Sequence, residues 1–263
     1  MDINLEGKKA FVCGSTQGIG KAAAIELAKL GATIVLLARN EESLRQVKDE
    51  LDTSKSRQHD YIAADFSEPE TLQSKVGEHL EKNPSPVHIL VNNTGGPPAG
   101  KAIDADLQEF ISAFQNHLIC NQILVQSLIE GMKSEKYGRI INVISTSVKQ
   151  PIPNLGVSNT IRGAVASWAK TLAGELGEFG ITVNNVLPGF TKTRRLQSII
   201  ENKARKTGDS IEKIEREMQA ETPAKRFAES YEIANAIAFL ASPAASYISG
   251  VNLPVDGGRT GCL

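Results

Sequence analysis

The chain has 263 residues, of which 41% are hydrophobic, and its formal net charge is −1 at pH 7. This length and composition suffice for one large core, so we predict a single domain over residues 1–263. The near-neutral charge excludes the strong positive field that draws proteins to nucleic acid or anionic membranes, and no apolar run approaches the roughly 20 residues of a membrane span. Three widely spaced cysteines indicate reduced thiols and a cytoplasmic location rather than a disulfide framework or a metal site.

Short apolar, β-rich runs alternate along the chain with longer helical patterns. The predicted strands, several of them nearly continuously apolar, are Lys8–Cys13, Thr33–Ala38, Tyr61–Ala64, Val87–Asn92, Arg139–Ile144, Thr182–Leu187 and Val251–Val255. The predicted helices are Gly18–Leu30, Glu41–Leu51, Glu70–Glu81, Ala105–Met132 and Val157–Glu178. This alternation predicts an α/β fold: a single-domain, Rossmann-type, doubly wound parallel sheet of about seven strands with helices on both faces.

A glycine-rich turn joins the first predicted strand to the first predicted helix. Glycines allow a tight turn and a close approach of the backbone to a pyrophosphate, and the amides at a helix N-terminus attract an anion. Because the motif stands between a strand and a helix, we predict that it binds a dinucleotide, the alternative being a glycine-rich turn without a ligand. The predicted binding residues are Gly14, Ser15, Gln17, Gly18, Ile19 and Gly20.

The end of the second predicted strand bears on the choice of dinucleotide. An acidic residue there would accept the ribose 2′-hydroxyl of NAD, but the chain has Ala38 followed by Arg39. With no carboxylate to repel a 2′-phosphate, and with a guanidinium able to bind one through two hydrogen bonds, the sequence favours NADP(H) over NAD(H). The alternative is that Arg39 only begins the turn into the next helix.

Three more segments follow later strands. They are Asn92-Asn93-Thr94-Gly95, Leu187-Pro188-Gly189-Phe190-Thr191-Lys192-Thr193 and Val255-Asp256-Gly257-Gly258. Together with the glycine-rich turn, they resemble the motifs of the short-chain dehydrogenase/reductase family, in the same order and over nearly the whole chain. The resemblance implies that the first segment stabilises the sheet and borders the cofactor, and that the second meets the nicotinamide. The residues to which it assigns cofactor contacts are Asn92, Thr94, Gly95, Pro188, Gly189, Thr191 and Thr193.

Asp65 follows the third predicted strand. The resemblance implies that this aspartate contacts the adenine of the cofactor. An aspartate at such a position would equally cap the helix that follows. We predict the cofactor contact.

The predicted helix Val157–Glu178 departs from the family. The proton-donating tyrosine of the family and its companion lysine correspond to Ser158 and Arg162, one helical turn apart, and its carbonyl-polarising serine corresponds to Ser145. An aliphatic hydroxyl is a far weaker acid than a phenol of pKa ~10, so Ser158 cannot simply replace the tyrosine. Arg162 has a fixed charge that can still hold the nicotinamide ribose. The alternative is an ordinary helix start, with Ser158 as a surface or capping hydroxyl and Arg162 in a solvent-exposed pair.

The predicted helix Ala105–Met132 adds another departure. Its expected core-facing stripe is Phe110, Phe114, His117, Asn121, Leu124 and Leu128. His117 falls where the family has a catalytic asparagine. With an ordinary pKa near 6.5, a histidine there could donate a proton directly or through water in place of the phenol. The alternative, and the more common arrangement, is a neutral buried histidine hydrogen-bonded to Asn121 or to a backbone carbonyl.

A mostly charged, helical stretch at Lys192–Lys225 interrupts the alternation. We predict a substrate lid over residues 190–225, and a solvated pair of surface helices is the equal alternative. The resemblance also implies a homotetramer or homodimer built partly through the two long helices.

These residues together predict an NADP-dependent oxidoreductase that acts by hydride transfer on a small carbonyl or alcohol substrate. Ser145 orients the substrate, Arg162 holds the ribose, and the proton comes from His117, from water or from the substrate itself. The alternative is a non-catalytic or regulatory protein that kept the dinucleotide-binding scaffold. No histidine spacing typical of a metal site occurs, so no metal is predicted.

Overall fold

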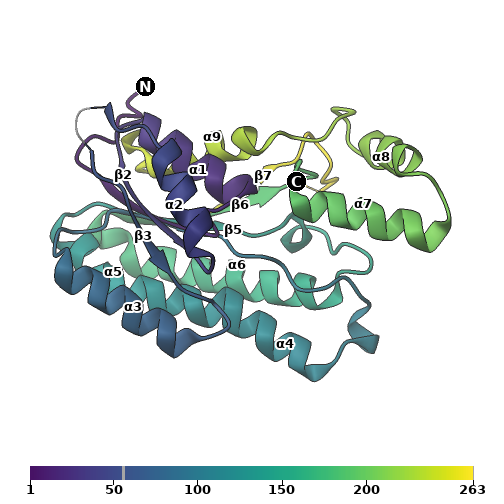
Figure 1. Cartoon of the computed structure of the whole chain (residues 1–263), viewed down its shortest axis with the longest axis horizontal. Coiled ribbons are helices and arrows are strands. Elements are labelled where there is room, and N and C mark those ends of the chain that lie inside the picture. Colours follow the sequence, from purple (N-terminus) through teal and green to yellow (C-terminus); the bar gives the residue numbers. More distant parts are fainter. Residues whose placement is uncertain (55–56, 263) are drawn as a thin grey trace.

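A parallel β-sheet forms the centre of the computed structural model, which describes residues 1–54 and 57–262 (Figure 1). The seven strands found among these residues lie in the order β3-β2-β1-β4-β5-β6-β7. Their bounds are β1 Lys9–Cys13, β2 Thr33–Ala38, β3 Asp60–Ala63, β4 Ile89–Asn92, β5 Gly138–Val143, β6 Ile181–Pro188 and β7 Asn252–Val255. The strand order reverses between β1 and β4, and such a reversal opens a crevice at the carboxyl ends of the strands. The predicted fold class is therefore confirmed.

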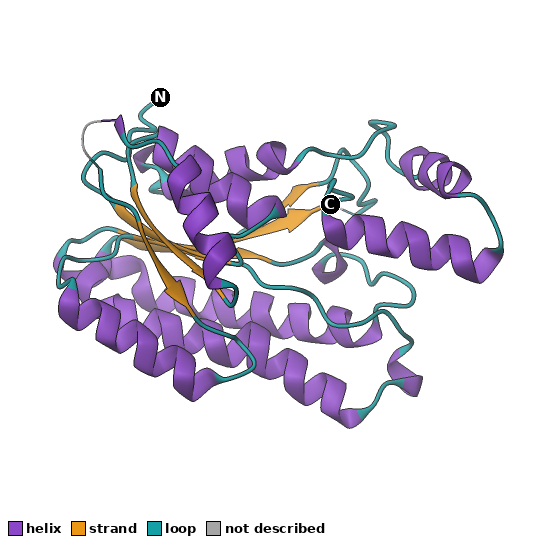
Figure 2. Cartoon of the chain, viewed as in Figure 1, coloured by secondary structure: helices purple, strands orange, loops and turns teal. Residues whose placement is uncertain are grey.

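Helices cover both faces of the sheet (Figure 2). One face carries α1 (Gly18–Lys29), α2 (Glu41–Glu50) and α9 (Ser230–Ala241). The other carries α3 (Pro69–Lys82), α5 (Cys120–Ser134) and α6 (Gly156–Leu176), with α4 (Leu107–Phe114) leading into α5. Among the described residues, none of the helices combines the length and apolar character needed to cross a bilayer.

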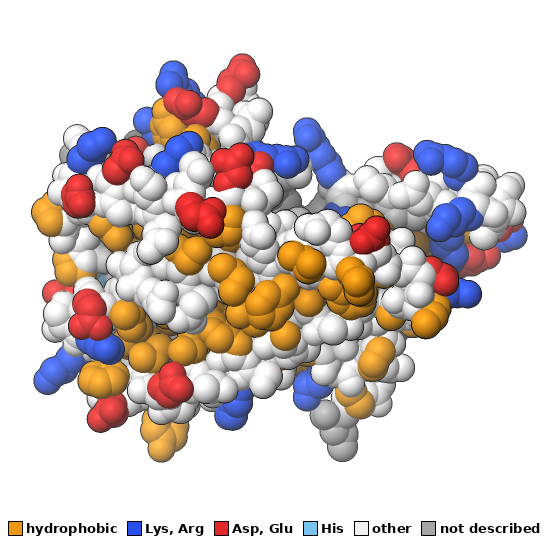
Figure 3. Space-filling view, turned by 90° about the horizontal axis from the view of Figure 1, so that it is seen from below, with side chains coloured by type: hydrophobic (Ala, Val, Ile, Leu, Met, Phe, Trp, Pro, Cys, Tyr) orange, Lys and Arg blue, Asp and Glu red, His pale blue; other side chains and the backbone are white. Residues whose placement is uncertain are grey.

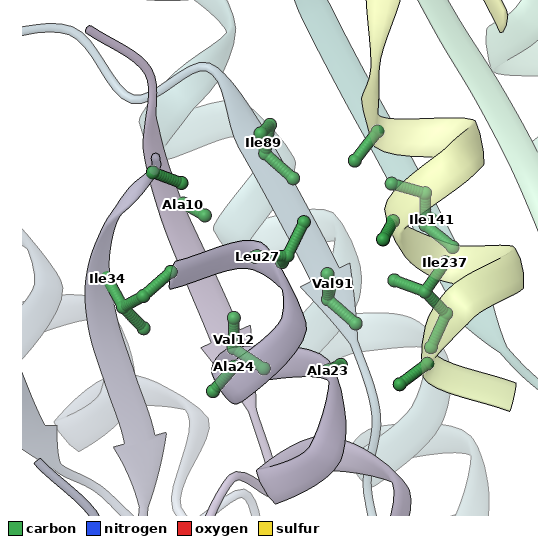
Figure 4. Close-up of a cluster of buried hydrophobic side chains, with 14 of the residues drawn as sticks. Ala10, Val12, Ala23, Ala24, Leu27, Ile34, Ile89, Val91, Ile141 and Ile237 are labelled. Carbon is green, nitrogen blue, oxygen red and sulfur yellow. The ribbon is translucent and has the colours of Figure 1, made fainter. Parts of the chain in front are cut away.

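A tightly buried core lies behind the carboxyl edge of the sheet. Strand β1 is buried from Ala10 to Cys13, and both faces of the strand contribute side chains to apolar clusters. Figure 4 shows Ala24 and Leu27 of α1 over this sheet, with Ile237 of α9 near Ile141 of β5. Each fully buried Leu or Ile contributes about 1.5–3 kcal/mol, so the strand ends form a firm base for the loops that follow them.

The long helix predicted over Ala105–Met132 is interrupted in the structure. A π-helical segment, η3 (Gln115–Ile119), separates α4 from α5. A π turn inserts an extra residue, which rotates the preceding side chains relative to the following ones. As a result Phe114 is 41% exposed, so its predicted place in the core-facing stripe was wrong, whereas His117 and Asn121 are buried as predicted.

Helices α7 (Arg194–Thr207) and α8 (Ile211–Ala220) project beyond the carboxyl ends of β6 and β7 (Figure 1). They pack on each other through a small apolar cluster of their own, separate from the two large clusters on the sheet. A backbone bridge between Thr191 and Ala228 closes the base of this excursion. The predicted helical character of the stretch is confirmed, while its role as a lid stays a prediction.

Candidate functional site

Three glycines of the turn after β1 stand where a side chain would be strained or would clash. Gly14 and Gly18 have φ of 57° and 55°, a backbone conformation that favours glycine. A β-carbon on Gly14 would lie 2.6 Å from the carbonyl oxygen of Asn93, and one on Gly20 would overlap the carbonyl oxygen of Gly14. The close packing of strand, turn and helix therefore dictates these three glycines.

The N-terminus of α1 is open to a ligand. Its N-cap residue, Gln17, makes no side-chain capping hydrogen bond, and the first turn contains no acidic residue. By contrast, the side chain of Asn40 caps α2 by accepting a hydrogen bond from the Ser43 amide at 2.7 Å. Uncapped amides at a helix N-terminus, together with the helix dipole, suit a pyrophosphate. Ser15 is fully buried, and its hydroxyl donates to the carbonyl oxygen of Leu37 in β2, so this side chain secures the turn.

Segments that are distant in the sequence meet at this turn. The Asn93 side-chain amide donates to the carbonyl oxygens of Cys13 and Gly14, at 3.2 and 3.3 Å. From the other side, the methyl group of Thr193 lies 3.1 Å from the position of a β-carbon on Gly18. Thr193 also caps α7 by accepting a hydrogen bond from the Leu196 amide. Sequence reasoning missed Asn93, although its place beside Asn92 in a motif was a usable signal.

A row of asparagine side chains crosses the sheet near its carboxyl edge. Asn92 donates to Asn142, Asn142 donates to Asn185, and Asn185 donates to Asn252, with N···O distances of 2.8, 2.9 and 2.8 Å. These four residues are direct neighbours in the register of β4, β5, β6 and β7. The side-chain oxygen of Asn92 is buried and has no partner among the described residues. The sheet-stabilising role implied for Asn92 is thus visible, but the row could not be foreseen because its members come from four strands.

Arg39 and Asp65 lie at the ends of β2 and β3. Arg39 is exposed and forms no hydrogen bond or salt bridge with any described residue. Asp65 accepts hydrogen bonds from the amide and the hydroxyl of Ser67, both at 2.9 Å, whereas Glu68 occupies the N-cap position of α3. The bonds from Ser67, with a further contribution from the charge of Arg39, lower the pKa of Asp65. The alternative in which Asp65 caps α3 is therefore wrong.

The residues predicted to be catalytic gather around the end of β5. Ser145 begins a short turn, η4 (Thr146–Val148), and its hydroxyl accepts a hydrogen bond from the Ser147 amide at 3.0 Å. Arg162 is only 8% exposed, and its Nη1 donates to the carbonyl oxygen of Val143 at 3.1 Å. Burial rules out the alternative of a solvent-exposed pair for Arg162. Ser158, in the first turn of α6, is half-buried, and its hydroxyl forms no hydrogen bond with any described residue.

Positive charge dominates this end of the site. Burial, and then the charge of Arg195, lower the pKa of Arg162 to about 10. Burial, and then the charge of Arg162, lower the pKa of His117 to about 2, while the backbone of Gly95 acts weakly in the opposite direction. His117 is therefore a neutral imidazole at physiological pH. Its environment favours the neutral, buried alternative and gives no imidazolium to serve as a proton donor.

A cavity of about 170 Å³ lies beside the turn that contains Ser145. Its walls come from the loop after β5, from the end of the α7–α8 excursion and from the C-terminal segment; they include Thr146, Ile152, Glu221 and Arg259. Arg259 spans two of these walls, because it pairs with Glu221 at 3.1 Å and lies over the ring of Phe190. A space of this size suits a small ligand or ordered water.

The fold, with a glycine-rich turn at the strand-order reversal, defines a Rossmann-type α/β protein. A family model described as enoyl-(acyl carrier protein) reductase matches residues 14–260. The NADPH-dependent reductase BacG of Bacillus subtilis is 30% identical over 253 residues, which cover 95% of this chain and 97% of that protein. The 3-oxoacyl-(acyl-carrier-protein) reductase FabG of Vibrio cholerae is 34% identical over 97% of this chain and 98% of its own length.

A solved reductase structure has nearly the same fold as this chain. L-Sorbose reductase from Gluconobacter frateurii, complexed with NADPH and L-sorbose, superposes with a TM-score of 0.93 at 30% identity, and the match covers 100% of each chain. The chain belongs to the short-chain dehydrogenase/reductase family of oxidoreductases.

Proposed function

We propose that this protein is an NADPH-dependent oxidoreductase that interconverts a small carbonyl compound and its alcohol without a tyrosine acid. The observation that carries the proposal is the pairing of an open, uncapped N-terminus on α1 with a buried guanidinium, that of Arg162, at the end of β5. The first is built for a pyrophosphate, and the second supplies positive charge next to Ser145. Relatives described as NADPH-dependent support the choice of cofactor.

The residues present fit a bound NADPH. The amides of Gly18, Ile19 and Gly20 are available to its pyrophosphate because no side chain caps them. Arg39 would take the 2′-phosphate, and Asp65 has an unshared carboxylate oxygen for the adenine. Residues expected to line the nicotinamide side are Asn92, Thr94, Gly95, Pro188, Gly189, Thr191, Thr193 and Arg162. When bound, this cofactor supplies the hydride.

The remaining chemistry is assigned to Ser145 and Arg162. Ser145 would donate its hydroxyl hydrogen to the carbonyl oxygen of the substrate while accepting from the Ser147 amide. Arg162 would place a buried positive charge beside this site, and a buried cation acts strongly where water is excluded. Since His117 is neutral, we propose that the proton comes from water, with the imidazole only relaying or orienting it.

Residues 190–225 would form the lid of this site and complete a single domain with the sheet. We also propose that the protein is a homo-oligomer. The exposed apolar side chains on α4 and the segments next to it are Ile103, Leu107, Ile111, Phe114 and Ile119. Apolar side chains also gather on the face seen from below in Figure 3. Self-association covers surfaces of this kind.

The proposal is tested by following NADPH oxidation over a panel of ketones. We expect a substrate-dependent rate that falls by ~100-fold in Ser145→Ala, the usual scale for losing one oxyanion donor. Ser158→Ala should stay within about threefold of wild type, because the Ser158 hydroxyl is too weak an acid to serve. Saturable NADPH binding with no oxidation of any ketone would instead favour the non-catalytic alternative.

A further inference from the structure

Two arginines converge on one point of the site without a carboxylate partner. Nη2 of Arg195 and Nη2 of Arg162 lie 3.7 and 3.9 Å from the position that a β-carbon on Gly96 would occupy. Arg195 belongs to the first turn of α7, and its guanidinium donates to the carbonyl oxygen of Pro97 at 2.7 Å. Neither arginine forms a salt bridge with a described residue. Two guanidinium groups therefore flank the point next to Gly96.

This arrangement is costly without an anion. Arg162 is more than nine-tenths buried, and its guanidinium forms one hydrogen bond with the described residues, to the carbonyl oxygen of Val143. Burial of an unpaired cation costs several kcal/mol, and a second cation nearby adds repulsion. The same cost lowers the pKa of Arg162 through burial and the charge of Arg195, whereas only burial lowers the pKa of Arg195, which is more exposed. An anionic group placed between the two guanidinium groups would reduce this cost.

We propose that Arg162 and Arg195 together bind the carboxylate of the substrate, so that the substrates are small 2-oxo or 3-oxo acids or the corresponding hydroxy acids. The inference rests on the proposed function, since it names the substrate class of that site. A planar guanidinium matches a carboxylate through two parallel hydrogen bonds. The hydrogen bond to Val143 holds the Arg162 guanidinium beside the residue two positions before Ser145. A carboxylate bound by Arg162 would therefore lie close to the carbonyl group that Ser145 would polarise.

The anionic groups of the cofactor have sites of their own. The pyrophosphate faces the uncapped amides of α1, and the 2′-phosphate has Arg39 at the end of β2. The arginine pair lies instead against Gly96, in the loop after β4, and beside the end of β5. The position of the pair thus favours the substrate over the cofactor as the source of the anion.

The test is a calorimetric titration of the NADP⁺-loaded protein with acetoacetate and, separately, with its neutral ethyl ester. We expect the acid to bind at least ~10-fold more tightly than the ester, and Arg195→Gln to remove that difference while changing the Kd of NADPH by less than about twofold. Arg194→Gln is the matched control, because Arg194 is an exposed neighbour in the same helical turn with no ion pair to a described residue. It should leave both titrations unchanged.

The outcomes separate the inference from the proposed function. Equal binding of acid and ester, or no binding of either, overturns the inference while NADPH turnover of ketones can still uphold the oxidoreductase. Equal losses of acetoacetate and NADPH binding in Arg195→Gln also overturn it, because the pair would then serve a cofactor phosphate. If the wild type binds no NADPH, the proposed function fails, and titration of the cofactor-free protein with acetoacetate and its ester still decides whether the pair prefers a carboxylate.

Discussion

The glycine-rich turn after β1 and the start of α6 face the same crevice but are constrained in different ways. At the turn, the backbone of Gly14 and the side chain of Asn93 fill the space where β-carbons would be, so packing dictates the residue type. At the start of α6, Ser158 is half-buried and its hydroxyl has no hydrogen-bond partner among the described residues. The fold therefore tolerates a change of chemistry at Ser158 that it would not tolerate at Gly20.

This difference distinguishes the residues that bind the cofactor from the residues that carry out the reaction. Residue types in the turn are required by the fold that creates the phosphate site, so the turn retains its motif as long as the fold is retained. Residues such as Ser158 and Arg162 are required only by the reaction, so they can differ when the proton route differs. We therefore expect substitutions in the turn to affect both stability and binding, and substitutions near α6 to affect mainly charge and rate.

The largest effect should come from Gly20→Val. Because a β-carbon there overlaps the carbonyl oxygen of Gly14, the turn must open, and we expect a loss of about 3 kcal/mol in the free energy of unfolding. NADPH binding should be abolished with it. Urea denaturation and NADPH titration measure the two losses. Gly163→Ala in α6 is the control: nothing lies within 4 Å of its β-carbon position, so it should stabilise the helix by ~0.5–1 kcal/mol.

On the reaction side, His117→Gln should change how stability depends on pH. The pKa of His117 is lowered to about 2 in the folded state, so the folded protein resists protonation that the unfolded chain accepts below pH ~6.5. Its contribution to stability is complete above that pH and declines as the pH falls toward 2. We expect the wild type to lose about 2 kcal/mol more than His117→Gln between pH 7 and pH 5. Urea midpoints at the two pH values measure this loss. An equal loss in the wild type and in His117→Gln would show that the pKa of His117 is not lowered.

Arg162→Met should have opposite effects on the stability of the protein and on its affinity for NADPH. Replacing an unpaired buried cation by an apolar side chain of similar length should raise the free energy of unfolding of the cofactor-free protein by ~1–2 kcal/mol. NADPH affinity should fall ~10-fold as the contact with the ribose is lost. Thermal unfolding and NADPH titration of the same sample provide both numbers. A variant that is less stable yet binds NADPH normally would show that Arg162 is structural.

The smallest of these effects is expected at Arg39. Arg39→Ala should weaken NADPH binding ~10-fold and leave NADH binding unchanged, because only the 2′-phosphate contact is removed. Arg45→Ala is a suitable control, since Arg45 already pairs with Glu41 on α2. Competition titrations with the two cofactors report the ratio. Parallel losses for NADPH and NADH would remove Arg39 from cofactor discrimination.

Sequence patterns predicted the sheet and most helices because buried parallel strands are continuously apolar and surface helices are periodic. They missed the π-helical break before α5, since no residue type marks the extra residue at Gln115–Ile119. The helix α9 was not placed either: half of its buried residues are alanine, and its N-terminal capping box combines Glu229 and Glu232 rather than a serine or threonine start.

Motifs located the glycine-rich turn, Arg39 and Ser145 because each follows a strand whose end lies at the same edge of the sheet. Arg162 was located by the family resemblance of its helix. Arg195 could not be found in this way. It lies in a charged helical stretch where nothing in the sequence distinguishes it from Arg194, and only the folded chain brings it beside Gly96. The burial of Arg162 and the neutral state of His117 likewise depend on contacts between distant segments.

If hydride transfer survives without a tyrosine acid, a deuterium label on the cofactor should pass to the product. NADPH doubly deuterated at C4 is incubated with a carbonyl substrate, and the alcohol product is analysed by mass spectrometry. We predict one deuterium per product molecule for the wild type and for Ser158→Ala, and little product for Ser145→Ala. A wild-type protein that binds NADPH but transfers no deuterium to any carbonyl compound would contradict the proposal that hydride transfer survives.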